Sequence, residues 1–166
     1  MGGKATVAGE HPPFFVYGTL RRGGRYHEAC LGGRVVTGSG PEPAILPGAS
    51  LFRGPGYPYA VPEPDRPDAF VRGELFRPLP GRDAEVREVL DRLEGYRPGA
   101  PDNLYEPVVA RVLRPDGTAV RARLYVAAPA LARRLRVEGE RIPGGDWMAD
   151  GVARIGPADA SDGPAG

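Results

Sequence analysis

Two alternating apolar segments joined by a tight turn constrain the fold of this chain more than any other feature. Residues 105–114 and 118–127 flank the turn sequence Pro115-Asp116-Gly117. In both arms apolar residues recur at every second position, the pattern of a half-buried strand, and Asp-Gly is a preferred hairpin turn sequence. The chain is therefore predicted to contain a long β-hairpin.

Shorter apolar runs separated by Gly and Pro predict further strands. They lie at residues 14–17, 34–39, 43–46, 50–53, 59–61 and 70–76. The last run contains Gly73, which predicts that another part of the chain comes close to it. One clear helix is expected from Asp83 to Gly95, where apolar residues recur at helical spacing. A shorter helix is expected at residues 129–135.

The length of 166 residues fits one domain with a substantial core. We place this domain at residues 13–155. Residues 1–12 and 156–166 are rich in Gly, Ala, Pro and Asp, which predicts two disordered tails.

The charge balance argues against nucleic-acid binding. The chain has 22 Lys and Arg against 21 Asp and Glu, a net charge of +1, whereas non-specific nucleic-acid binding needs clustered positive charge. No apolar run approaches the roughly 18 residues that suggest a membrane span. The single cysteine, Cys30, excludes an intramolecular disulfide and fits a reducing compartment. We therefore expect a cytoplasmic protein, a monomer or weak homodimer, without a membrane partner.

Metal and cofactor motifs are weak in this sequence. Two His and one Cys do not make up a zinc site, so no metal ligands are assigned. The segment Gly38-Ser39-Gly40 begins like a dinucleotide-binding loop, but Pro43 stands where the third glycine is needed. We expect no cofactor.

The segment Tyr17, Gly18, Thr19 and Leu20, called here the Tyr-Gly turn, is the first candidate for a functional site. A buried strand that runs into a Gly turn leaves backbone N–H groups at its end. Such groups can hold a carboxylate or a developing oxyanion. A plain strand-to-loop turn gives the same pattern and remains an alternative.

Glu94 is the second candidate. It lies at the border of the apolar stripe of the predicted helix, in the last helical turn. Partial burial and the negative end of the helix dipole both favour the protonated carboxyl group, as general acid/base catalysis needs. The alternative is a partly exposed acid paired with Arg92 or Arg97. Asp91 is expected on the solvated side of the helix, and a supporting role beside Glu94 is the alternative.

These segments resemble the γ-glutamylcyclotransferase-like family of small cytosolic domains. The motifs that carry the resemblance are Tyr-Gly-Thr-Leu-Arg-Arg-Gly at 17–23, Pro-Ala-Ile-Leu at 43–46, Val-Arg-Gly-Glu-Leu-Phe at 71–76, Leu-Asp-Arg-Leu-Glu-Gly-Tyr at 90–96, Tyr105, residues 122–126 and Gly-Asp-Trp at 145–147. Together they cover roughly residues 14–148.

The resemblance implies an α+β fold, a small mixed β-barrel with a few packed helices and an active-site cavity at the barrel mouth. It implies that the Tyr-Gly turn binds the α-amino acid end of the substrate, that Glu94 is the catalytic acid/base and that Tyr105 lines the pocket. Members of the family often carry Arg after this tyrosine, where the present chain has Glu106 and Pro107. The substrate specificity can differ for that reason.

The implied activity is that of a γ-glutamyl cyclotransferase, an amide-cleaving enzyme. The α-amine of a small γ-glutamyl substrate attacks its own side-chain amide, giving 5-oxoproline and a free amine. Two alternatives stay open: a non-catalytic small-molecule binding domain of the same fold, and an acyltransferase with another substrate.

Overall fold

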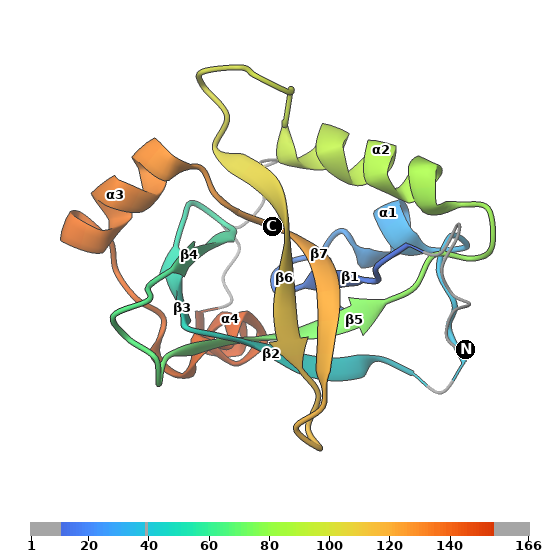
Figure 1. Cartoon of the computed structure of the whole chain (residues 1–166), viewed down its shortest axis with the longest axis horizontal. Coiled ribbons are helices and arrows are strands. Elements are labelled where there is room, and N and C mark those ends of the chain that lie inside the picture. Colours follow the sequence, from blue (N-terminus) through green and yellow to red (C-terminus); the bar gives the residue numbers. More distant parts are fainter. Residues whose placement is uncertain (1–10, 39, 155–166) are drawn as a thin grey trace.

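The computed structural model describes residues 11–38 and 40–154, with the main chain alone for 151–154. Within this part of the chain, five strands close into a barrel in the order β1-β5-β2-β6-β7, and β3 and β4 form a separate two-stranded sheet (Figure 1). The strands are β1 (Phe14–Val16), β2 (Glu42–Pro47), β3 (Ala49–Arg53), β4 (Pro58–Pro62), β5 (Phe70–Phe76), β6 (Tyr105–Leu113) and β7 (Ala119–Ala127). The helices are α1 (His27–Leu31), α2 (Asp83–Glu94), α3 (Pro129–Glu138), the 3₁₀ turn η2 (Pro143–Gly145) and α4 (Trp147–Arg154).

This architecture confirms the predicted α+β barrel with packed helices. The β6–β7 hairpin is confirmed too, paired from Tyr105↔Ala127 to Leu113↔Ala119. The predicted strand at 34–39 is wrong: among its described residues only Val35 forms an isolated bridge, to Pro78. The predicted tails at 1–12 and 156–166 lie outside the described residues except for His11 and Pro12, which precede β1.

Strand β1 closes the barrel although it has only three residues. It pairs antiparallel with β5, and parallel with β7 at Phe14↔Arg123. The Arg123 N–H also donates to the carbonyl oxygen of Pro13 at 2.8 Å. The strand that precedes the Tyr-Gly turn is therefore held on both edges.

Gly73 on β5 lies where β1 crosses closely, as the sequence predicted. A Cβ atom at this position would lie 2.4 Å from the carbonyl oxygen of Val16 and 2.6 Å from the Phe15 ring. Both distances are far shorter than a van der Waals contact, so any side chain here would push β1 away from β5.

Alternate residues of the barrel strands enter two different hydrophobic clusters, because successive side chains of a strand point to opposite faces. Phe14 and Val16 join the cluster that contains Leu90 of α2. Phe15 and Tyr17 join the second cluster. Helix α2 covers one side of the barrel (Figure 1), and its last turn therefore lies beside the end of β1 and the body of β7.

Two helices were not predicted. Helix α1 has only five residues, and α4 contains a glycine and an aspartate, so neither has a strong helical pattern. No helix in the described ranges is both long and apolar enough to cross a bilayer.

Candidate active site

The Tyr-Gly turn is buried along its whole length, directly after β1. Its carbonyl groups shape the following loop: the Gly18 oxygen accepts from the N–H of Arg21 at 3.1 Å, and the Thr19 oxygen accepts from the N–H of Tyr26 at 2.9 Å. The Leu20 oxygen lies 2.9 Å from Nδ1 of His27. These contacts fix the turn in one conformation.

The Thr19 side chain carries an unsatisfied polar atom inside this turn. Thr19 is 5% exposed, and its Oγ1 has no hydrogen-bond partner among the described residues. Buried polar atoms in folded proteins are nearly always paired with protein or water. This hydroxyl is therefore available to a bound ligand.

Arg21 clamps the turn to two other parts of the chain. Its guanidinium group donates to Glu74 on β5 at 3.2 Å and to Asp146 at 2.8 Å. Glu74 also accepts from the N–H of Arg22 at 2.8 Å. Asp146 in turn accepts from the N–H of Met148 in the first turn of α4 at 3.1 Å, so a single carboxylate connects the Tyr-Gly turn to α4.

The pKa of Asp146 is lowered by this arrangement. Burial acts in the opposite direction and raises it, but the hydrogen bonds from Arg21 and from backbone N–H groups of α4 outweigh burial. Asp146 is therefore held as a carboxylate. The charge of Asp146 is thus available to hold Arg21 against the start of α4.

Glu94 is the last residue of α2 and is only 1% exposed. Gly95 ends the helix in a left-handed conformation (φ 69°), and its N–H donates to the Arg92 carbonyl at 3.2 Å. The sequence placed Glu94 at the border of the apolar stripe; the structure buries it completely. Arg92 and Arg97 form salt bridges with Glu88 and Asp102.

Glu94 lies among hydroxyl groups and a thiol. Burial is the main reason that the pKa of each surrounding group is raised. The negative charge of Glu94 raises each of these pKa values further. The groups are Tyr17, Tyr59, Tyr105, Tyr125 and Cys30. The structure thus brings Glu94, Tyr17 and Tyr105 together from α2, the end of β1 and the start of β6.

Two of these tyrosines have hydroxyl groups held by the backbone. The Tyr17 hydroxyl donates to the carbonyl oxygen of Tyr125 at 2.6 Å and accepts from the N–H of Ala60 at 3.3 Å. The Tyr105 hydroxyl donates to the carbonyl oxygen of Pro58 at 2.6 Å. Both rings are therefore fixed walls beside Glu94.

Two further tyrosines near Glu94 were missed by the sequence analysis. The Tyr59 ring stacks on Tyr105 with centroids 5.0 Å apart. The hydroxyl of Tyr125 donates to Asp91, so this half-buried carboxylate has a partner on β7 in addition to solvent. Tyr125 lies inside a motif that supported the resemblance, but an alternating strand pattern does not tell which polar partner a side chain reaches.

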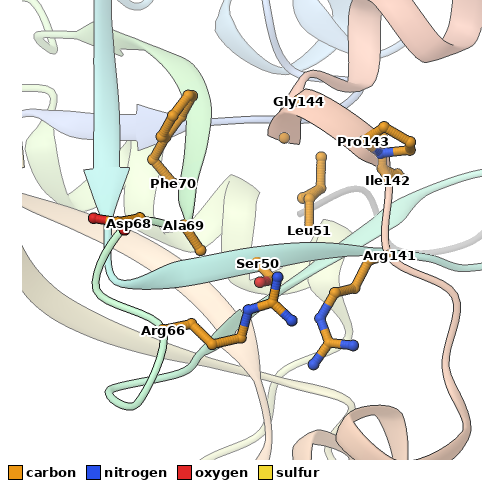
Figure 2. A pocket seen from close by; sticks show the side chains of 11 residues that line it. Ser50, Leu51, Arg66, Asp68, Ala69, Phe70, Arg141, Ile142, Pro143 and Gly144 are labelled. Atoms are coloured by element: carbon orange, nitrogen blue, oxygen red, sulfur yellow. The ribbon is translucent and has the colours of Figure 1, made fainter.

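Four surface cavities with volumes of 230–480 Å³ are lined by described residues, and neither Glu94 nor the Tyr-Gly turn lines any of these four. Figure 2 shows one of them, with Arg66 and Arg141 beside Ser50. Arg141 there donates to Glu63 through two nitrogens, at 3.1 and 2.6 Å. Its charge is already matched by a buried acid, so we do not assign this cavity as the active site.

The described residues contain no group of three or more His, Cys, Asp and Glu side chains suited to hold a metal ion. The groups that the structure places near Glu94 include the hydroxyls of Tyr17, Tyr59, Tyr105 and Tyr125. These groups can transfer protons and stabilise a developing negative charge.

Comparison with known proteins points to one family. The family model described as "Gamma-glutamyl cyclotransferase, AIG2-like" matches residues 14–149. No curated protein matches the sequence significantly.

Several solved structures share the fold. YkqA from Bacillus subtilis superimposes with a TM-score of 0.60 at 20% identity, over 89% of this chain and 44% of YkqA, so the chain spans less than half of that protein. The AIG2-like protein from Mus musculus superimposes with a TM-score of 0.54 at 21% identity, over 72% of this chain and 81% of the mouse protein. The uropathogenic E. coli-specific protein c4763 superimposes with a TM-score of 0.51 at 17% identity, over 84% of this chain and 94% of c4763.

Proposed function

The chain belongs to the gamma-glutamyl cyclotransferase, AIG2-like family, and on this premise we propose that it releases 5-oxoproline from a γ-glutamyl amine or γ-glutamyl amino acid. The observation that carries the proposal is the position of Glu94: a carboxyl group 1% exposed, among tyrosine side chains and beside the end of the strand that leads into the Tyr-Gly turn. A strongly perturbed environment around a buried acid is a mark of a functional site.

The proposed reaction is an intramolecular displacement. The α-amine nitrogen attacks the side-chain amide carbon and forms the ring bond of 5-oxoproline. The bond from that carbon to the leaving nitrogen then breaks. One proton must leave the attacking nitrogen and one must reach the leaving nitrogen, so the overall reaction needs no external oxidant, reductant or water.

Glu94 is the proposed proton carrier between the two nitrogens. A carboxyl group positioned beside both nitrogens can accept the proton from the attacking nitrogen and return it to the leaving nitrogen. A positioned acid/base group of this kind contributes about 10²–10⁴-fold to a rate.

The Tyr-Gly turn is the proposed substrate cradle. Its backbone N–H groups would bind the α-amino acid end of the substrate or the oxyanion that develops on the amide, and the buried Thr19 hydroxyl offers one more hydrogen bond. Tyr105 would act as a pocket wall, because its own hydroxyl already donates to Pro58.

The test is an assay of 5-oxoproline release from a panel of γ-glutamyl amines, γ-glutamyl dipeptides and glutathione. We expect turnover of at least one class by the wild type, and a loss of about 10³-fold or more in kcat for Glu94→Gln. Glu63→Gln is the matched control, since Glu63 is also a buried glutamate and its salt bridge to Arg141 lies outside the proposed site; its kcat should stay within about threefold. Equal turnover by Glu94→Gln and the wild type would refute the assignment.

A further inference from the structure

The last turn of α2 is tied to the barrel by a hydrogen bond that the proposed chemistry does not use. The Tyr125 hydroxyl on β7 donates to the Asp91 carboxylate on α2, across 34 residues of sequence. Tyr125 is buried. Burial first, and then the bond to Asp91, raises the pKa of its hydroxyl, which therefore stays protonated and remains a donor.

The same tyrosine also contacts the first residue of the Tyr-Gly turn. Its carbonyl oxygen accepts from the Tyr17 hydroxyl at 2.6 Å, and that hydroxyl accepts from the N–H of Ala60 at 3.3 Å. Tyr125 therefore connects two elements. Its hydroxyl donates to Asp91 on the helix, and its main-chain carbonyl accepts from Tyr17 at the end of β1.

Asp91 and Glu94 are three residues apart on one helix, so their side chains are neighbours on its surface. Fixing Asp91 against β7 consequently fixes the helical turn that carries Glu94. This turn needs an anchor, because the helix ends at Glu94 and the chain then enters a largely exposed loop at residues 95–104.

We propose that Asp91 and Tyr125 are positioning residues that hold Glu94 in register with the Tyr-Gly turn; this inference rests on the proposed function. Neither group needs to touch the substrate. Their effect is geometric, since a misplacement of about 1 Å between a catalytic group and its substrate can cost about 10²-fold in rate. In metal sites, removing a hydrogen bond that orients a ligand lowers metal affinity or activity by about 10–100-fold. We use this range as the expected size of the effect on kcat.

The test compares four variants by steady-state kinetics on the best substrate of the panel. Tyr125→Phe removes the donor and Asp91→Ala removes the acceptor, and each should lower kcat by about 10–100-fold with KM within about twofold. Asp91→Asn keeps an oxygen that accepts the Tyr125 hydrogen bond, so it should retain most of the activity. The double variant Tyr125→Phe/Asp91→Ala should be no slower than either single variant, because the two residues act as one unit.

A purely structural role predicts different kinetics. In that case thermal stability would fall while kcat per folded molecule stayed at the wild-type level. That result would overturn the inference. A double variant whose loss in kcat is the product of the two single losses would also overturn it, and so would an Asp91→Asn variant as slow as Asp91→Ala.

Amide hydrogen exchange in the last turn of α2 gives a readout that needs no turnover. Exchange at residues 91–94 should be about tenfold faster in Tyr125→Phe and Asp91→Ala than in the wild type and Asp91→Asn. Unchanged exchange would contradict the anchor. A wild type that is inactive on the whole panel but shows this exchange pattern would refute the proposed function and not the anchor.

Discussion

Among the described residues, Glu63 and Glu94 are the two least exposed glutamates, and different groups lie around them. Glu63 is 3% exposed and receives two hydrogen bonds from Arg141. Those bonds are the main reason that its pKa is lowered, with a smaller contribution from Ser50. Glu94 is 1% exposed and lies among tyrosines whose own pKa values it raises.

The difference separates an acid that serves the fold from one suited to chemistry. An acid held by an arginine is locked in its charged form, and removing it leaves a cation partly desolvated. Glu94 lies beside tyrosine hydroxyl groups, and under the proposed function it changes its protonation state during the reaction. Burial alone therefore does not identify a catalytic acid; the identity of its neighbours does.

The largest effect expected from this comparison is on the stability of the two glutamine variants. Glu63→Gln should lower the free energy of unfolding by about 2 kcal/mol, because Arg141 loses its matching charge. Glu94→Gln should lower it by less than Glu63→Gln does, because glutamine keeps the size of the side chain and can hydrogen-bond to the tyrosine hydroxyl groups beside it. Urea unfolding followed by circular dichroism measures both. The comparison breaks if the Glu94 variant is the less stable of the two.

A second test replaces the arginine and keeps its charge. Arg141→Lys should lower the free energy of unfolding by about 1 kcal/mol, because lysine cannot make the paired contacts of a guanidinium group with both carboxylate oxygens. The same urea titration serves here, with the exposed Arg133→Lys as a control expected to match the wild type. A variant as stable as the wild type would mean that charge alone, without geometry, holds Glu63.

The smallest effect is the pH dependence of the Glu63 contribution. The pKa of Glu63 lies below its ordinary value of 4.5 in the folded state. Its contribution to stability is therefore complete at pH values above 4.5 and is lost as the pH falls through the folded pKa, with a slope of at most about 1.4 kcal/mol per pH unit.

Comparing Glu63→Gln with the wild type isolates this term, because glutamine does not titrate. The difference in unfolding free energy between the two proteins should be constant from pH 6 to 8 and should shrink below pH 4.5. A difference that is independent of pH over this range would contradict the ion pair.

Much of the fold could be predicted because its signals are local. Alternation in the β6–β7 hairpin and the helical spacing of α2 each lie within one segment of the sequence, and Gly73 marked the crossing of β1 correctly. Barrel closure is different. It depends on a parallel pairing between Phe14 and Arg123, more than a hundred residues apart, which no local pattern encodes.

The same distinction applies to the two acids. Glu94 was identified because helical periodicity places it against the apolar stripe. Glu63 was not singled out, because it lies between two prolines after β4 and its partner Arg141 is 78 residues away. The Tyr125 partner of Asp91 was missed for a related reason: the position of Asp91 on the helix is readable, but the reach of a tyrosine from β7 is not.

The closed barrel has a consequence for the order in which this protein can form. β1 is synthesised before the other strands of the barrel, yet its parallel neighbour β7 follows about a hundred residues later, and one of the two carboxylates that hold Arg21 comes only at Asp146. Because contacts so distant in sequence form only after long stretches of chain have been ordered, the Tyr-Gly turn is completed late although its own residues are made before those of the other strands. A nascent chain that stops short of Asp146 lacks one of the two carboxylate contacts that clamp this turn, however well its hairpin and its α2 helix have folded.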